Sequence, residues 1–191
     1  MAFDRRAFLI SGLAAVAPKP LLAANASMVE TARRLLEQNA ARIEQRDVAA
    51  IADYGAPSWR PRFHLVDVSK SSVVSLLVAH GRGSDPRHTG WLQAFSNEVG
   101  SNASSAGAYL TGDIYYGKYG RSMRLVGLDK ENANAKPRAI VIHSAWYVGE
   151  DMLAKHGKLG RSEGCFTLSQ AGLAKALDLI GPGRLLFAGK F

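Results

Sequence analysis

The sequence predicts a mainly β domain with a few helices, and three observations carry this prediction. From residue 62 onward, short β-rich runs are separated by loop-forming segments rich in glycine, serine and proline. These runs do not alternate regularly with long helical patterns, which argues against a parallel βαβ fold. With 191 residues, of which 47% are hydrophobic and 21% charged, the chain can form one domain with its own core.

Residues 1–26 have the pattern of an export signal. Arg5 and Arg6 precede an apolar run that continues to Val16, and residues 24–26 are small enough for a cleavage site. The order Asp-Arg-Arg-Ala-Phe-Leu around the two arginines is typical of a twin-arginine signal. The apolar run is too short to span a bilayer comfortably, so we expect a cleaved leader and not an anchor. The mature chain is therefore expected in the periplasm, without integral membrane contact.

Residues 27–61 are predicted to form an N-terminal helical segment. The helix is expected from Met28 to about Ile51, because apolar residues recur there at near-helical spacing. These residues are Leu35, Leu36, Ala40 and Ile43. Glycine and prolines between residues 55 and 61 then end the helix.

The remaining elements lie within residues 62–191. Two β-rich runs, residues 62–68 and 72–80, flank a Ser-Lys-Ser turn and predict a β-hairpin. Ser169 can cap a helix that continues through Leu179. Further strands are predicted at residues 108–116, 122–128, 138–144 and 185–187.

The charge balance of the chain indicates an anionic partner. The formal net charge of +8 falls to +6 when the leader is removed, because the leader carries three cations and one anion. Such a charge suits nucleic acid, phospholipid or a carboxylate-rich polymer. The basic residues are scattered, with no Lys/Arg block and no interleaved aromatic residues, so we expect no nucleic-acid partner. For an exported protein, the bacterial cell wall is the expected acidic partner.

Cys165 is the only cysteine of the chain and follows Gly164. Exported proteins usually pair their cysteines, so a single one is either a buried thiol or a reactive nucleophile. His143 ends an apolar strand 22 residues earlier, and an imidazole within reach of a thiol can accept its proton. The alternative is that His143 satisfies a hydrogen bond in the core and Cys165 is a small buried hydrophobe.

These residues resemble the motif of a known family. A strand-ending His143-Ser144 followed by Ser162-Glu163-Gly164-Cys165 is similar to the catalytic domains of L,D-transpeptidases (YkuD-like), and most similar to their YkuD_2 branch. The resemblance spans about residues 62–187. It implies a YkuD-like β-sandwich or barrel at residues 62–191, with an N-terminal helix and a helix after the cysteine. Glu163 and Thr167 depart from the histidine and asparagine of the family motif, so we expect altered donor recognition.

The resemblance implies a peptidoglycan L,D-transpeptidase. Cys165 would be the acylated nucleophile and His143 the general base, with the Ser144 carbonyl holding the imidazole and the N–H groups of Gly164 and Cys165 binding the oxyanion. The thioester formed with an L-centre of a stem peptide would pass to a diaminopimelate amine, giving a 1→3 or a 3→3 cross-link. Stem peptides and carbapenem-type inhibitors are the implied partners, and no metal or other cofactor is required.

Five further residues are candidates for substrate binding. Arg161 and Ser162 precede the nucleophile, and the Arg161 guanidinium could lower the thiol pKa and bind a substrate carboxylate. His80 and Arg82 follow a predicted strand and could bind stem carboxylates beside the cleft, whereas the alternative is a surface loop. Tyr147 could form a wall of the cleft, although aromatic residues at this spacing are more often part of the core.

Three alternative functions remain open on the sequence alone. Water could resolve the same thioester, which would give an L,D-carboxypeptidase or endopeptidase. The chain could be a noncatalytic domain that binds the cell wall and keeps a structural thiol. A metallopeptidase is disfavoured, because the other histidines lack the paired spacing of zinc ligands.

Overall fold

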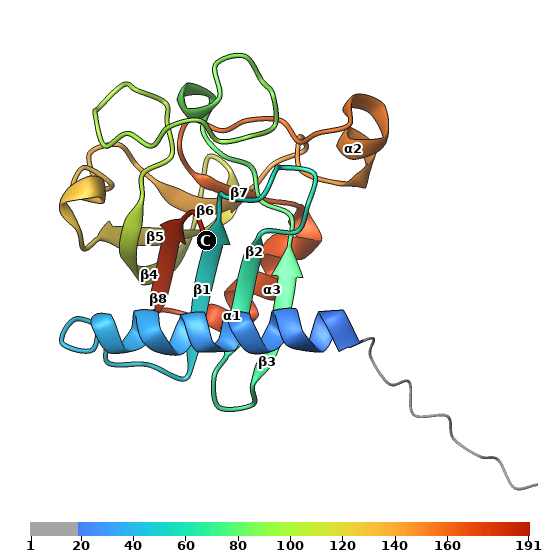
Figure 1. Ribbon diagram of the computed structural model, residues 1–191. Helices are drawn as coiled ribbons and strands as arrows, with labels where there is room; N and C mark the ends of the chain where they lie inside the picture. Colours follow the sequence, from blue (N-terminus) through green and yellow to red (C-terminus); the bar gives the residue numbers. More distant parts are fainter. Residues whose placement is uncertain (1–18) are drawn as a thin grey trace, which may run out of the picture.

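A computed structural model describes residues 19–191 and shows eight strands in a single sheet with three α-helices in this part of the chain (Figure 1). The strand order is β3-β2-β1-β8-β4-β5-β6-β7. The strands are β1 (Val48–Asp53), β2 (Phe63–Asp67), β3 (Ser72–Leu76), β4 (Gly107–Gly117), β5 (Gly120–Gly127), β6 (Val141–Ser144), β7 (Phe166–Leu168) and β8 (Leu185–Gly189). The helices are α1 (Lys19–Gln38), α2 (Glu150–His156) and α3 (Gln170–Ile180). The predicted mainly β fold is confirmed.

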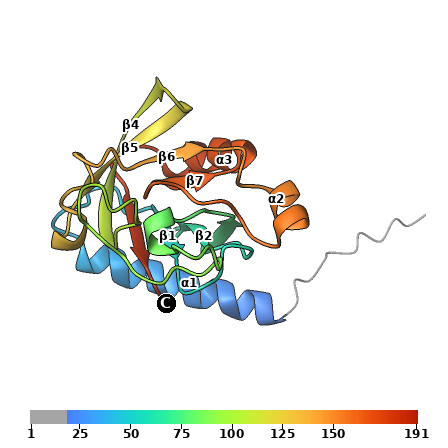
Figure 2. The same cartoon turned by 90° about the horizontal axis from the view of Figure 1, so that it is seen from above.

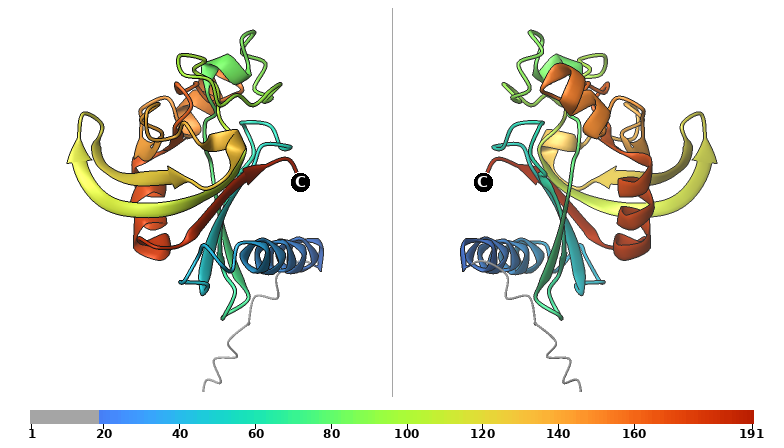
Figure 3. Two further views of the ribbon diagram at one scale, coloured as in Figure 1. Left: turned by 90° about the vertical axis from the view of Figure 1, so that its left-hand side faces the viewer. Right: turned by 90° about the vertical axis from the view of Figure 1, so that its right-hand side faces the viewer.

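Two parallel pairings interrupt a sheet that is otherwise antiparallel. β1 pairs with β8 and β6 pairs with β7 in parallel, and both pairings join segments that are distant in the sequence or separated by a helix. The predicted hairpin of β2 and β3 is confirmed, although β3 ends at Leu76 and does not extend to residue 80. Ala79 instead forms an isolated bridge with Thr167. The long β4–β5 hairpin projects beyond the rest of the strongly curved sheet (Figure 3).

The sheet has an apolar core on each side. Alternate residues of β1 supply both, because successive side chains of a strand point to opposite faces. Ala49 and Ile51 pack with α1, whereas Ala50 and Ala52 belong to the core that includes α3. Figure 2 shows α1 and α3 on opposite sides of the strands. Around β1 the molecule therefore has three layers, with α1 on one face of the sheet and α3 on the other.

The helix predicted over residues 28–51 is wrong in its second half. α1 ends at Gln38, and Val48–Asp53 forms β1 between β2 and β8. The first five residues of β1 are all buried, so their side chains lack the alternation of polar and apolar residues that marks a half-exposed strand. A continuous apolar run of this length does not distinguish a buried strand from a buried helix. Residues 27–61 therefore contribute a strand to the sheet in addition to a helix.

The N-terminal leader is only partly covered by the structure. Residues 1–18 lie outside the described residues, and residues 19–26 form the first turns of α1. The predicted cleavage site at residues 24–26 thus falls within a helix. No helix among residues 19–191 is both long and apolar enough to cross a membrane.

The segment around β6, β7 and α3 positions the candidate site. The parallel register pairs His143 of β6 with Thr167 of β7, so Cys165 lies immediately before β7 and next to the β6 strand. Ser169 caps α3 as predicted, because its Oγ accepts a hydrogen bond of 3.0 Å from the Gly172 N–H. The cap, four residues after the cysteine, fixes the start of α3 at Gln170.

Candidate active site

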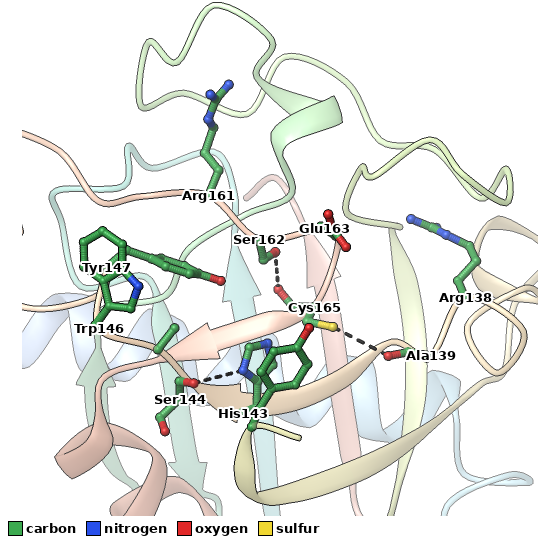
Figure 4. A pocket seen from close by; sticks show the side chains of 12 residues that line it. Arg138, Ala139, His143, Ser144, Trp146, Tyr147, Arg161, Ser162, Glu163 and Cys165 are labelled. Atoms are coloured by element: carbon green, nitrogen blue, oxygen red, sulfur yellow. Dashed lines mark hydrogen bonds between the residues drawn. The ribbon is translucent and has the colours of Figure 1, made fainter. Parts of the chain in front are cut away.

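His143 and Cys165 line the same cleft of about 470 Å³ (Figure 4). The parallel pairing of β6 with β7 brings these two residues together across the 22 positions that separate them in the sequence. The residues that line the cleft are Tyr119, Arg138, Ala139, His143, Ser144, Ala145, Trp146, Tyr147, Arg161, Ser162, Glu163 and Cys165. The cleft thus contains a thiol, an imidazole and charged groups of both signs.

Two hydrogen bonds fix the imidazole of His143. Its Nδ1 lies 3.0 Å from the Ser144 carbonyl oxygen, which can only accept, so Nδ1 carries the proton. Nε2 is therefore the acceptor nitrogen, and it lies 3.2 Å from the Thr167 hydroxyl. Burial lowers the pKa of His143, while the Ser144 carbonyl acts in the opposite direction. The ring is thus held neutral with its basic nitrogen on the Thr167 side.

The Cys165 thiol is half-buried and points away from the imidazole. Its Sγ donates to the Ala139 carbonyl oxygen at 3.6 Å. Within residues 19–191 it makes no hydrogen bond with His143. Burial raises the pKa of the Cys165 thiol, and the nearby Glu163 carboxylate adds to this, whereas a backbone hydrogen bond from Val141 and the charge of Arg138 lower it. The resting state is therefore a protonated thiol beside a neutral imidazole.

The loop that carries Cys165 is shaped by its own hydrogen bonds. The Ser162 hydroxyl donates to the Cys165 carbonyl at 2.8 Å and accepts from the Gly164 N–H at 3.1 Å. Gly164 has φ +115°, and a Cβ there would lie 2.6 Å from the Ala103 carbonyl oxygen, so this position requires glycine.

These contacts correct two expectations for the same loop. The Gly164 N–H is occupied by Ser162, so it is not free to bind an oxyanion as expected. The Ser162 hydroxyl is likewise engaged within the loop, although Ser162 lines the cleft. Ser162 therefore shapes the loop that carries Cys165, and substrate binding by its side chain is not supported. The Cys165 N–H, by contrast, has no hydrogen-bond acceptor in the described part of the chain.

The prediction that His80 binds substrate beside the cleft is wrong. His80 is only 1% exposed, does not line the cleft, and lies between Arg62 and Asp85. Its Nδ1 is 2.8 Å from Arg62 Nη2 and its Nε2 is 3.4 Å from Asp85 Oδ2. Burial, followed by the charge of Arg62, lowers the pKa of His80 to about 4, although Asp85 acts in the opposite direction. His80 is a buried neutral residue of the structural core.

Arg82 and Arg161 differ from the roles expected of them. Arg82 does not line the cleft, and it reaches the site only through an ion pair of 3.0 Å with Glu163. Arg161 lines the cleft, but its Nη1 donates to the carbonyls of Asp85 and Pro86, and its side chain rises away from Cys165 (Figure 4). The cation that lowers the thiol pKa is therefore Arg138, not Arg161 as expected.

Aromatic side chains border the cleft on two sides. Tyr147 lines it as expected, and its hydroxyl lies 3.4 Å from Thr167 Oγ1. Tyr119, at the turn of the β4–β5 hairpin, stacks on the His143 ring with centroids 4.3 Å apart and an angle of 23°. Sequence reasoning missed Tyr119, because the hairpin turn gives no local signal of its contact. It also missed Arg138, although this residue lies only three positions before β6, the strand that carries His143.

The described residues offer no ready metal site. No group of three or more His, Cys, Asp or Glu side chains within residues 19–191 is arranged to hold a metal ion.

Three comparisons relate the chain to known proteins. A family model described as an L,D-transpeptidase catalytic domain, YkuD_2, matches residues 22–188, which includes most of α1 and all of β1 ahead of the predicted boundary at residue 62. No curated protein matches. Similar solved structures are an L,D-transpeptidase from Mycobacterium smegmatis (13% identity, TM-score 0.46) and one from Mycobacterium tuberculosis H37Rv (16%, 0.42). In each case 75% of this chain is covered.

This chain spans only 58% of the length of each of those two structures. A third similar structure is an L,D-transpeptidase in complex with imipenem (13% identity, TM-score 0.45), with 75% of this chain and 59% of that chain covered. The family assignment rests on the match over residues 22–188, and it agrees with the YkuD-like fold that the motif implies. The chain belongs to the L,D-transpeptidase catalytic domain family, in its YkuD_2 branch.

Proposed function

We propose that the chain is a peptidoglycan L,D-transpeptidase in which Cys165 forms a thioester with a stem peptide. Membership of the family supports an acyl-transfer reaction. The single observation that supports Cys165 and His143 as the reacting pair is their place in one cleft, with His143 Nδ1 engaged by Ser144 and the basic nitrogen at Nε2, which accepts from the Thr167 hydroxyl in the resting state. This tautomer is the one that a general base requires.

The first half of the proposed reaction forms the acyl-enzyme. Rotation of the Cys165 side chain moves Sγ from the Ala139 carbonyl toward His143, whose Nε2 takes the thiol proton. The thiolate attacks the carbonyl carbon of an L-centre, and the Cys165 N–H donates to the oxyanion that forms. The intermediate collapses, the bond to the D-residue breaks, and the imidazolium gives its proton to the departing amine. The product is a thioester on Cys165.

The second half transfers the acyl group. A diaminopimelate amine of another stem peptide attacks the thioester carbonyl and loses a proton to the neutral His143. The C–S bond breaks, a new amide bond forms, and the imidazolium returns its proton to the Cys165 thiolate. The enzyme is thereby restored without any metal or other cofactor.

The decisive test is the intact mass of the protein after exposure to a carbapenem. We expect wild-type protein to gain the mass of one inhibitor molecule, because the thiol opens the β-lactam ring and forms a covalent adduct. Cys165→Ala is expected to gain none. A wild-type protein that stays unmodified under the same conditions, or an adduct that persists in Cys165→Ala, would contradict the proposal.

The cross-link and the acceptor are tested with muropeptides. Incubation with purified muropeptides followed by sequencing of dimers distinguishes the two products, because only a 3→3 donor retains D-Glu. Hydrolysed monomers alone, in the presence of excess amine acceptor, would assign an L,D-carboxypeptidase or endopeptidase instead. A Cys165→Ala variant that keeps the wild-type cellular phenotype would point to a noncatalytic wall-binding domain.

We also propose that the protein acts in the periplasm after export by the twin-arginine route. The support is the sequence pattern around Arg5 and Arg6, which precedes the described residues. Replacing both arginines by lysine in the full-length chain should retain the protein in the cytoplasmic fraction. Unchanged export of that variant would exclude the twin-arginine route.

A further inference from the structure

A cationic side chain, Arg138, lines the cleft next to the carbonyl to which the Cys165 thiol points. The Cys165 Sγ points to the carbonyl of Ala139, and Arg138 is the residue before it (Figure 4). Arg138 lines the same cleft as Cys165. The resting thiol is therefore directed toward the Arg138–Ala139 turn and not toward the imidazole.

Hydrogen bonds hold the Arg138 guanidinium in one place. Its Nη1 donates to the Ser96 carbonyl at 2.7 Å and to the Ser105 hydroxyl, and its Nη2 donates to the Ala103 carbonyl. All three acceptors belong to the loop of residues 96–105, which precedes β4. Because a planar guanidinium with several fixed partners has little freedom left, its charge stays where these bonds put it.

The same guanidinium lies directly against the nucleophile loop. A Cβ on Gly164 would be 2.9 Å from Arg138 Nη2 and 2.6 Å from the Ala103 carbonyl oxygen. The missing side chain of Gly164 is thus what lets Arg138 and its loop approach Cys165.

The turn that follows Arg138 is strained. Ala139 has φ +51°, a left-handed conformation that non-glycine residues rarely adopt. This residue carries the carbonyl that accepts the Cys165 thiol. Backbone strain that persists next to a reactive group indicates that the surrounding contacts enforce the geometry.

We propose that Arg138 is a positioning residue that stabilises the thiolate of Cys165 and clamps the loop of residues 96–105 against the nucleophile loop. The proposal deepens the proposed function and rests on Cys165 reacting as a thiolate. Arg138 acts through Cys165 and needs no contact with the substrate.

The charges around the thiol agree with this role. Burial raises the pKa of Cys165, and the charge of Arg138 acts in the opposite direction. Burial lowers the pKa of Arg138, and Tyr109 followed by Cys165 acts against this. The titratable and charged groups that face Cys165 from the surrounding elements are Tyr54, Tyr119, Arg138, His143, Tyr147, Arg161 and Glu163. Of these, Arg138 is the cation whose charge lowers the pKa of the thiol.

The test measures the rate of Cys165 alkylation by iodoacetamide across pH, which reports the thiolate fraction without any peptide substrate. Arg138→Gln should move the alkylation profile to higher pH and lower the rate near neutral pH by about 3–10-fold, since one pKa unit is tenfold in thiolate. Arg138→Lys keeps the positive charge but loses the two-pronged guanidinium that donates to the loop of residues 96–105. It should therefore be alkylated faster than Arg138→Gln but more slowly than the wild type.

Arg42→Gln is the matched control. Arg42 also donates to a backbone carbonyl, that of Leu128, and carries the same charge, but it does not line the cleft. Its alkylation profile should coincide with that of the wild type. Ser105→Ala removes one anchor of the guanidinium without changing any charge, and it should give a smaller shift than Arg138→Gln in the same direction.

The outcomes separate this inference from the proposed function. A folded Arg138→Gln variant with a wild-type profile, or one that shifts no more than Arg42→Gln, would overturn the role of Arg138. If Arg138→Gln does not fold, Ser105→Ala and Arg138→Lys take its place as the test. Wild-type alkylation profiles in both of these variants would also overturn the role of Arg138. A shifted profile together with no carbapenem adduct on the wild type would uphold the role of Arg138 and refute the transpeptidase.

Discussion

Two histidines of this chain end up in opposite kinds of environment. His80 and His143 both follow strand-like runs, both are nearly buried, and burial lowers the pKa of both. His80 is held between the charged side chains of Arg62 and Asp85. Within residues 19–191, the hydrogen-bond partners of His143 are neutral groups, the Ser144 carbonyl and the Thr167 hydroxyl, and its ring stacks on Tyr119 at the cleft. Burial alone therefore does not distinguish a structural histidine from a catalytic candidate, whereas the partners do.

The network around His80 supports the cleft from behind. Arg62 is fully buried and donates to the carbonyls of Val78 and Ala56 in addition to His80. The His80 carbonyl accepts from the Ser162 N–H at 2.9 Å, so the same segment is attached to the nucleophile loop. The side chains of Arg62 and His80 have their hydrogen-bonding groups occupied, so this network makes the back of the cleft rigid. His143 in the cleft is the histidine that remains able to exchange a proton.

The largest expected effect is on the rate of acylation and concerns His143, the histidine in the cleft. His143→Ala should slow acylation of Cys165 by about 10²–10⁴-fold, the usual cost of losing a general base. Because burial raises the pKa of Cys165, raising the pH beyond the ordinary thiol pKa of ~8.5 should partly rescue this variant, since hydroxide then generates the thiolate. Time-resolved intact mass with a carbapenem measures the rate. Acylation of His143→Ala at the wild-type rate near neutral pH would remove His143 from the mechanism.

The wild-type profile for the same reaction has a defined acid limb. The imidazole must be neutral to accept a proton, and its pKa is lowered by burial. Acylation should therefore persist on the acid side until the pH falls below the ordinary histidine value of ~6.5. A midpoint clearly above that value would contradict the neutral His143 of this structure.

The next effect is on the stability of the buried network. Arg62→Met should lower the free energy of unfolding by about 3–5 kcal/mol, because it leaves the Val78 and Ala56 carbonyls and a His80 nitrogen without their donor in a buried site. Denaturant unfolding measures the change. The exposed neighbour Arg60 gives the control, and Arg60→Met should change stability by less than about 0.5 kcal/mol. Equal effects of the two variants would show that the network carries no special stability.

Acid should separate the two histidine environments further. His80 has its pKa lowered to about 4, so the unfolded chain binds a proton near pH 6.5 that the folded chain refuses. The contribution of His80 is complete above about pH 6.5 and is lost as the pH falls toward 4, by at most about 3 kcal/mol. His80→Asn should flatten this part of the stability curve. An unchanged slope in His80→Asn would assign the acid sensitivity to other groups.

The smallest expected effect concerns the exposed carboxylate of the cleft. Glu163 raises the pKa of Cys165 and pairs with Arg82 at the surface. Glu163→Gln should therefore increase iodoacetamide alkylation near neutral pH by no more than about threefold, because solvent screens an exposed charge. Glu98→Gln, at an exposed position of the loop before β4 that does not line the cleft, is the control and should leave alkylation unchanged. Slower alkylation in Glu163→Gln would reverse the assigned sign.

Local patterns in the sequence determined the elements whose signals are short-range. The β2–β3 hairpin and the capping of α3 by Ser169 follow from neighbouring residues, as does the candidacy of a lone cysteine after glycine. β1 is buried on both faces, so its sequence lacks the alternation of polar and apolar residues that marks a strand. Whether this segment forms a strand or a helix was therefore decided by the packing of α1 and α3 on its two sides.

The composition of the cleft was decided by the tertiary structure. Tyr119 reaches His143 through the β4–β5 hairpin, and Arg138 reaches Cys165 through the β6–β7 pairing. His80 lies in the core and not in the cleft, where it is held by a hydrogen bond with Arg62, 18 positions away in the sequence. The sequence determined which groups were chemically able to react. The long-range pairing of strands decided which of them share a cavity, because strand neighbours and burial depend on contacts that no local window contains.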